Sequence, residues 1–249
     1  MTMKKTNHTM RRIRSWMRSP RYHVLKAKDK MIGIGDEFFN QKRETYTPGD
    51  YRWLALTEAM YGGLQIGGVN TGMNRGGDRM SPCFHNYGRS YSEFFMPLLA
   101  DVDADFTVVE VGILNGSGLA IWCDLFPKAR VIGMDLNLSN FEENRAGLEA
   151  LGAFQQNTPE LYTIDQLDRS VADKAFRDAL GEDKVDVFID DGHHSLESIE
   201  ITFEGIKPYL AEGFVGFIED NFDTYDHLAH RHGDCWWTTR GELTVVKYK

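Results

Sequence analysis

Apolar and polar positions alternate regularly through the carboxyl-terminal part of the chain. Runs rich in valine, isoleucine and other apolar residues occur at 106–112, 129–137, 160–165, 185–192 and 213–221. Segments between them carry apolar residues at helical spacing, at 119–126, 141–152, 170–180 and 196–210. Continuous apolar strands that alternate with helices indicate a parallel sheet covered on both faces.

The last fifteen residues follow a different pattern. Residues 235–249 form two strand-like runs on either side of Arg240 and Gly241, which indicates an antiparallel pair closed by a turn. We therefore predict an α/β fold for residues 101–249. It is a Rossmann-like, doubly wound and mostly parallel sheet with an antiparallel carboxyl-terminal strand.

An extension at 31–100 precedes this domain. Residues 51–61 and 84–99 have helical spacing, whereas 62–82 hold seven glycines and no periodicity. A loop of this length is uncommon unless it is a functional lid or a linker. We expect a lid over 62–90 that closes on the ligands. Its expected contacts with them are His85, Tyr87 and Arg89.

Charge separates the first thirty residues from the rest. The chain has a net charge of −9. Residues 1–30 hold ten lysines and arginines against Asp29 alone, which leaves 18 basic and 36 acidic residues elsewhere. Such an acidic body argues against nucleic acid as a ligand, because phosphate binding needs a basic face. The basic arm is either a disordered tail or a peripheral contact with anionic membrane lipid.

Cysteine usage and hydropathy indicate a cytoplasmic protein. No run of about eighteen apolar residues is present to span a bilayer, and residues 1–30 lack the apolar core of a secretory signal. The three cysteines, Cys83, Cys123 and Cys235, are odd in number and form no Cys-x-x-Cys pair. We expect buried thiols in a reducing compartment, and a membrane-binding arm would place the protein at the cytoplasmic membrane face.

The first predicted strand ends in the glycine-rich turn EVGILNGSG at 110–118. Ligands of open α/β sheets bind at such turns, where glycines let them approach the backbone. A G-x-G-x-x-G fingerprint is absent, which disfavours a nicotinamide-dependent oxidoreductase. Asp135 ends the second strand, where a carboxylate can accept hydrogen bonds from both ribose hydroxyls; the alternative is a helix cap. Asp165 and Gln166 follow the third strand, either as adenine contacts or as an ordinary polar loop.

These features favour a nucleoside ligand without phosphates, and S-adenosylmethionine fits that description. The residues expected to bind it lie at the ends of the first four strands. They are Glu110, Gly112, Asn115, Gly116, Ser117, Asp135, Asp165, Gln166 and Asp190.

Acids and histidines follow the fourth and fifth strands. IDDGHHS and IEDN bring Asp190, Asp191, His193, His194, Glu219 and Asp220. Consecutive strands of a doubly wound sheet are neighbours, so the two clusters should face each other. Crowded carboxylates repel one another unless a cation lies among them, and oxygen ligands favour Mg²⁺, Ca²⁺ or Mn²⁺. The alternative is that these acids cap helices or line a solvated rim.

The motifs resemble those of the metal-dependent macrocin and mycinamicin sugar O-methyltransferases, with cephalosporin hydroxylase-like proteins as more distant relatives. The resemblance covers roughly residues 75–225 and is most specific in IDDGHHS and IEDN. EVGILNGSG and HNYGRSY also match. It implies Mg²⁺ (or Mn²⁺) held by Asp191, Glu219 and Asp220, with His194 as the general base and His193 near the substrate.

By this resemblance the chain is an S-adenosylmethionine-dependent O-methyltransferase that acts on a hydroxyl of a sugar or glycan. The metal would lower the pKa of the hydroxyl, His194 would remove its proton, and the alkoxide would attack the methyl group. A catechol-type O-methyltransferase and a non-catalytic S-adenosylmethionine-binding protein are the alternatives. The chain is shorter than the macrolide enzymes, and we expect a homo-oligomer.

Overall fold

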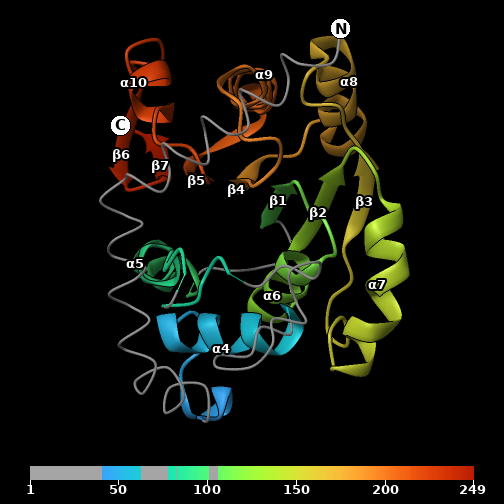
Figure 1. Ribbon diagram of the computed structural model, residues 1–249. Helices are drawn as coiled ribbons and strands as arrows, with labels where there is room; N and C mark the ends of the chain where they lie inside the picture. The colour runs from blue at the N-terminus through green and yellow to red at the C-terminus, as the bar shows by residue number, and fades with distance from the viewer. Residues whose placement is uncertain (1–40, 63–77, 83, 101–105) are drawn as a thin grey trace, which may run out of the picture.

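The computed structural model describes residues 41–62, 78–82, 84–100 and 106–249 (Figure 1). The basic arm, Cys83 and residues 63–77 of the glycine-rich loop lie outside the described residues, and with them lie the predicted membrane contact and much of the lid predicted over 62–90. Among the described helices, none is both long and apolar enough to cross a membrane.

A seven-stranded sheet forms the centre of the molecule (Figure 1). Its strands are β1 (Thr107–Val111), β2 (Arg130–Asp135), β3 (Glu160–Thr163), β4 (Val185–Asp190), β5 (Leu210–Ile218), β6 (Cys235–Arg240) and β7 (Leu243–Tyr248). The order is β3-β2-β1-β4-β5-β7-β6. The first five strands are parallel, whereas β7 runs antiparallel to both β5 and β6. The predicted fold class is confirmed.

The strand order places a crevice between β1 and β4. The chain winds outward from β1 through β2 to β3, then returns to β4 on the other side of β1. Loops that leave β1 and β4 therefore diverge to opposite faces, and ligands bind at such switch points. Val111 at the end of β1 pairs with Asp190 at the end of β4, and Asp190 pairs with Ile218 on β5. The three strand ends, and the acids that follow them, are level with one another.

Helices cover both faces of the sheet (Figure 1). On one face lie α4 (Tyr51–Gly62), α5 (Gly88–Leu98), α6 (Ser117–Leu125) and α7 (Ser139–Ala150). On the other lie α8 (Arg169–Leu180), α9 (Leu196–Ile206) and α10 (Thr224–Leu228). Two short 3₁₀ turns, η2 (Arg43–Thr45) and η3 (Lys207–Tyr209), complete the described elements.

The alternation of side chains along β1 divides the core into two layers. Val108 packs in the cluster on the α6 side, whereas Val109 and Val111 pack in the cluster on the α8 and α9 side. Helices α4 and α5 contribute to the first cluster, so the extension shares its core with the sheet. The ring of Tyr91 on α5 stacks on Phe217 of β5, with centroids 4.0 Å apart. This contact fixes α5 beside the end of β5.

Candidate functional site

A pocket of about 430 Å³ lies at the carboxyl ends of β1, β2 and β4, within the size range of small-molecule sites. Five acidic side chains line it, and Arg79 is the one lysine or arginine among its described lining residues. The residues predicted from the sequence that line it are Gly112, Ser117, Asp135, Asp165, Gln166, Asp191, His193 and His194. The pocket is therefore acidic as well as concave.

The glycine-rich turn after β1 packs so closely against its neighbours that a side chain would not fit at Gly112 or Gly116. Gly112 has φ +88°, and a Cβ there would lie 2.3 Å from the carbonyl oxygen of Asp191. Gly116 has φ +81°, and a Cβ there would lie 2.2 Å from the ring of Phe141. Both positions need glycine because of backbone conformation and space. The turn after β1 is thereby packed against the segment that follows β4.

Asp135 lies at the pocket wall, where the loops after β1 and β2 meet. Its Oδ2 accepts a hydrogen bond from the backbone N–H of Leu114 at 3.0 Å, and its Oδ1 accepts one from Asn137 at 2.9 Å. A carboxylate oxygen has two lone pairs, so each can accept a further hydrogen bond. Asp135 is thus oriented by the backbone and able to bind a vicinal diol such as a ribose.

Gln166 joins the loops that follow β3 and β4. Its Nε2 donates to Asp190 Oδ1 at 2.8 Å and to Thr202 Oγ1 at 2.9 Å, while its Oε1 accepts from the backbone N–H of His193 at 2.9 Å. Burial raises the pKa of Asp190 to about 6, against the lowering effect of the bond from Gln166. Gln166 therefore positions the turn that carries both histidines.

Four residues predicted to contact the donor lie beside the pocket lining instead of in it. Gly116 shapes the turn, Asp190 is buried under Gln166, and the carbonyl oxygen of Asn115 accepts a hydrogen bond from Asn144 at 2.8 Å. Glu110 is buried below Gly118, where a Cβ would lie 2.3 Å from its Oε1. The positions of these four residues suit a role in holding the pocket lining in place.

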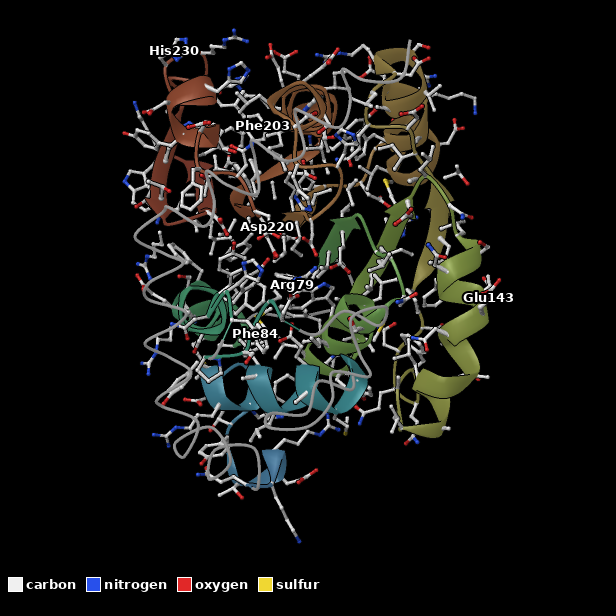
Figure 2. All side chains as sticks on the ribbon, in the orientation of Figure 1. Arg79, Phe84, Glu143, Phe203, Asp220 and His230 are labelled. Carbon is white, nitrogen blue, oxygen red and sulfur yellow. The ribbon has the colours of Figure 1, made fainter. Side chains whose placement is uncertain are left out.

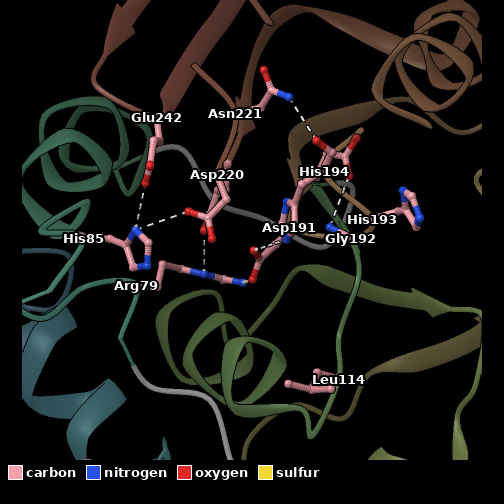
Figure 3. A network of polar contacts seen from close by, with 12 residues as sticks. Arg79, His85, Leu114, Asp191, Gly192, His193, His194, Asp220, Asn221 and Glu242 are labelled. Atoms are coloured by element: carbon pink, nitrogen blue, oxygen red, sulfur yellow. Dashed lines mark hydrogen bonds and ion pairs between the residues drawn. The ribbon is translucent and has the colours of Figure 1, made fainter. Parts of the chain in front are cut away.

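Asp191, His194 and Asp220 meet at the ends of β4 and β5 (Figure 3). Each offers one ligand atom, and these atoms all lie within 4.8 Å of one another. His194 Nε2 lies 3.9 Å from Asp191 Oδ1. His194 and Asp220 both have positive φ, 59° and 57°. Such backbone conformations are costly for non-glycine residues and concentrate at functional sites.

Glu219, the residue before Asp220, shares the guanidinium of Arg79 with Asp191. Its Oε2 pairs with Arg79 Nε at 3.1 Å, and its Oε1 accepts a hydrogen bond from the hydroxyl of Tyr91. Arg79 also pairs with Glu110 Oε1 at 2.8 Å and with Asp191 Oδ2. Glu219, predicted as a metal ligand, thus lies next to Asp191 in this cluster.

The guanidinium of Arg79 pairs with three carboxylates in this cluster. Burial alone would lower the pKa of Arg79, but the charges of Glu219, Asp191 and Glu110 outweigh it and hold the pKa well above its ordinary value. Burial raises the pKa of Glu219 and of Glu110, because a single shared cation does not offset their desolvation. The cluster therefore holds more carboxyl groups than its one guanidinium can keep ionised.

Two of the three predicted lid contacts reach this cluster. Tyr87 donates its hydroxyl to Asp220 Oδ1 at 2.6 Å, and burial together with Asp220 raises the pKa of Tyr87. His85 Nδ1 lies 3.3 Å from Asp220 Oδ1 and 3.4 Å from Glu242 Oε2, which forms a second group of ligand-type atoms. Arg89 instead lies over the ring of Tyr51, 4.3 Å from its centroid. His193 Nδ1 lies 3.1 Å from Ser195 Oγ.

Several residues of the site were missed by sequence reasoning, among them Glu58, Arg79, Tyr91 and Glu242. Arg79 lies in a glycine-rich stretch without periodicity, so nothing in the local pattern indicated its partners. Tyr91 had a signal, because it follows Tyr87 by four residues and such residues share one side of a helix. Glu58 belongs to no recognisable sequence motif.

The residues present fit both ligands that the motifs implied. The pocket holds Asp135 for a diol and has no phosphate-binding lysine or arginine among its described lining residues, since Arg79 is engaged by three carboxylates. Asp191 and Asp220 each offer a carboxylate oxygen, and these lie within 4.8 Å of one another and of a ring nitrogen of His194. Two carboxylates with room for water or substrate oxygens are a usual magnesium site in proteins.

Comparison with known proteins confirms the resemblance inferred from the motifs. No family model matches the chain. It is 28% identical over 151 residues to 8-demethyl-8-alpha-L-rhamnosyl tetracenomycin-C 2'-O-methyltransferase of Streptomyces olivaceus, which covers 57% of this chain and 34% of that protein. It is 29% identical over 132 residues to L-olivosyl-oleandolide 3-O-methyltransferase of Streptomyces antibioticus, covering 49% and 30%. The chain thus spans about a third of the length of these curated relatives.

A solved structure supports the fold assignment. The structure of the methyltransferase MycE from the mycinamycin biosynthetic pathway, in complex with Mg, SAH and mycinamycin VI, aligns with a TM-score of 0.50 and 18% sequence identity. The alignment covers 68% of this chain and 50% of that one. At this identity the likeness establishes the Rossmann-like methyltransferase fold.

Proposed function

We propose that the protein is a magnesium-dependent O-methyltransferase that transfers the methyl group of S-adenosylmethionine to a hydroxyl of a sugar-containing acceptor. The observation that carries this proposal is that Asp191 and His194 belong both to the nucleoside-sized pocket and to the group of ligand atoms with Asp220. A donor in the pocket and a hydroxyl at the acids would therefore meet at these two side chains. The names of the curated relatives support a sugar as the acceptor.

The donor is assigned to the pocket by charge and by shape. S-adenosylmethionine supplies a methyl group on a positively charged sulfur. The aspartates in the lining, Asp78, Asp135, Asp165 and Asp191, attract a cation and repel phosphate, which favours this donor over a dinucleotide. Asp135 accepts hydrogen bonds from the ribose hydroxyls, while Asp165 and Gln166 lie at the next strand end for the adenine. Gly112 lets the donor approach the backbone of the turn.

The acceptor hydroxyl is assigned to Asp191, His194 and Asp220. Asp191, Glu219 and Asp220 would hold Mg²⁺ or Mn²⁺, which when bound would lower the pKa of a hydroxyl that contacts it. His194 takes the hydroxyl proton on its Nε2, which faces Asp191. The oxygen then forms a bond to the methyl carbon as the carbon–sulfur bond breaks, and S-adenosylhomocysteine leaves. Catalysis is therefore mainly positioning and proton removal.

Calorimetry with the full chain tests the donor assignment. S-adenosylmethionine and S-adenosylhomocysteine should bind with a micromolar or lower Kd, and NADH should show no heat of binding. Saturable NADH binding together with no S-adenosylmethionine binding would refute the proposal. Donor binding that lacks any metal-dependent methyl transfer would instead support a non-catalytic binding protein.

A further inference from the structure

Glu58 is a buried carboxylate in the wall of the donor pocket. It lies on α4, is 2% exposed and is one of the five acidic side chains of the lining. Its hydrogen bonds with described residues both go to Oε2, from the backbone N–H groups of Met80 at 2.7 Å and Ser81 at 3.1 Å. Oε1 therefore has lone pairs available for a ligand. Burying a carboxylate oxygen without a donor is costly, which indicates a ligand that supplies one.

The contacts of α4 place Glu58 near the beginning of α6. Helix α4 packs against α6. The segment that Glu58 binds also carries Arg79, which lies between α5 and the strand ends (Figure 2). Arg79 pairs with Glu110 at 2.8 Å, and Glu110 is packed under Gly118 in the first turn of α6. Glu58 thus belongs to the end of the pocket that Ser117 and Gly118 line.

The proposed donor would direct its amino-acid part toward this end of the pocket. With the ribose at Asp135 and the adenine near Gln166, the methionine part extends past Gly112 toward Ser117 and Gly118. The beginning of a helix favours a carboxylate through its N–H groups and dipole, and α6 has no acid in its first turn. The α-ammonium group of the donor then needs an acceptor close by.

The other four acidic side chains of the lining each have a different partner. They are Asp78, Asp135, Asp165 and Asp191. The first lies 3.5 Å from His85 Nε2, the second and third are assigned to the ribose and the adenine, and the fourth pairs with Arg79. The ion pairs of Arg79 are with three carboxylates other than Glu58. Among the described acids of the lining, Glu58 is therefore left for a cation of the donor.

We propose that Glu58 binds the α-ammonium group of S-adenosylmethionine, an inference that rests on the proposed donor assignment. Glu58 Oε1 accepts a hydrogen bond from the ammonium group, while Oε2 keeps its bonds with Met80 and Ser81. Hydrogen bonds between charged groups are stronger than neutral ones, and burial strengthens them further. Glu58 thus selects donors with a free amino group. Because it also holds the backbone next to Arg79, it joins the donor to the segment that reaches the acid cluster.

A thermodynamic cycle of ligand and protein variants tests this contact by calorimetry with the full chain. The ligands are S-adenosylhomocysteine and its desamino analogue, which keeps the carboxylate and lacks only the amino group. The unmodified protein should bind S-adenosylhomocysteine at least about tenfold more tightly than the analogue, the scale expected for a charged hydrogen bond. In Glu58→Gln, which keeps an acceptor for Met80 and Ser81, the two Kd values should differ by less than about threefold.

Asp78→Asn is the matched control, because it neutralises another acid of the same lining. Its preference for S-adenosylhomocysteine over the analogue should stay within about threefold of that of the unmodified protein, since the side chain of Asp78 is 55% exposed and lies beside His85. A second ligand, 5′-methylthioadenosine, lacks the whole amino-acid part. Its Kd should change by less than about threefold in Glu58→Gln, which shows that the rest of the pocket is intact.

Proton release by the unmodified protein tests the contact even if Glu58→Gln fails to fold. Burial raises the pKa of Glu58 to about 8, against the lowering effect of Arg79, and the charge of Asp78 adds to the rise. At pH 7 the carboxyl group therefore holds a proton that it must lose to accept one from the ammonium group. Calorimetry in buffers of different ionisation enthalpy should show release of about one proton with S-adenosylhomocysteine and none with the desamino analogue.

The outcomes distinguish this inference from the proposed function. Equal affinity of the unmodified protein for the two ligands, a preference that persists in Glu58→Gln, or equal proton release would overturn the role given to Glu58 and leave the donor assignment standing. Loss of the preference in Asp78→Asn but not in Glu58→Gln would overturn it in favour of Asp78. Absence of binding of both S-adenosylhomocysteine and 5′-methylthioadenosine would refute the donor assignment and this inference with it.

Discussion

Asp135 is the single side chain on which the donor assignment depends most. Replacing it by asparagine keeps one oxygen but places an NH₂ group against a backbone donor, Leu114 or Asn137. We expect Asp135→Asn to weaken S-adenosylmethionine binding by about 1–3 kcal/mol, the cost of stranded hydrogen-bond partners. Calorimetry measures this loss. Asp183→Asn, at a surface ion pair with Arg130, is the matched control, and equal donor affinity in the two variants would contradict the assignment.

Glu58 gives a pH dependence of stability that a residue substitution can isolate. Burial raises its pKa from 4.5 to about 8, against the lowering effect of Arg79. The folded state therefore holds a proton that the unfolded state has lost between these two pH values, so stability falls as pH rises through this window. Glu58→Gln keeps an oxygen for Met80 and Ser81 and removes the titration.

The free energy of unfolding of Glu58→Gln minus that of the unmodified protein should therefore rise with pH. The expected slope is about 1.4 kcal/mol per pH unit between pH 4.5 and about 8. Urea unfolding at a series of pH values measures it, and other titrating groups cancel in the difference. A difference that stays constant over this range would show that Glu58 titrates alike in both states.

Residues at strand ends could be predicted, whereas residues brought in from outside the sheet could not. Asp135, Asp191 and Asp220 each follow an apolar strand, so the topology alone placed them at one edge. Arg79 meets Asp191 across 112 positions of the chain, and no pattern in the glycine-rich stretch foretold that pairing. The hydrogen bond from Tyr91 to Glu219 likewise depends on how α5 packs.

At the scale of elements, the turn between β1 and α6 joins the donor pocket to the acid cluster. Gly112→Ala forces a Cβ to within 2.3 Å of the Asp191 carbonyl oxygen at φ +88°. We expect a loss of about 1–3 kcal/mol in stability, the range for a strained backbone, together with weaker donor binding. Thermal unfolding and calorimetry measure the two effects.

Gly213→Ala is the control for this substitution. Gly213 lies in β5, and nothing lies within 4 Å of the place its Cβ would take. Its unfolding and donor affinity should match those of the unmodified protein. Similar behaviour of Gly112→Ala and Gly213→Ala would mean that the β1 turn tolerates a side chain, and that its glycines do not set the pocket.

The regular elements were predictable because their periodicity is local. Each predicted strand and helix from 106 onward is present, including the antiparallel pair at Cys235–Arg240 and Leu243–Tyr248. The helix expected at 84–99 is shorter, since α5 begins at Gly88. Residues 84–87 form turns instead, and there His85 and Tyr87 reach the acids. The contacts of His85 and Tyr87 with the acids thus lie in the part of this segment that is not helical.

At the scale of the whole molecule, two features from different parts of the chain combine into one site. The doubly wound sheet brings the donor pocket and the strand-end acids to one edge, which the order of strands made predictable. The segment around 78–91 then supplies Arg79, Tyr87 and Tyr91 to those acids. Its position depends on packing between α4, α5 and β5, so it required the structure.

Methyl transfer by the full chain with tritiated S-adenosylmethionine is the decisive assay of the proposed function. The acceptors are glycosides with free hydroxyls and, in parallel, catechols, each assayed with Mg²⁺, with EDTA and with Mg²⁺ restored. The proposed function predicts label on a glycoside, loss of transfer in EDTA and recovery with Mg²⁺, because Asp191 and Asp220 need the cation to activate the hydroxyl. Transfer to a glycoside that is undiminished in EDTA, or transfer to catechols alone, would contradict it.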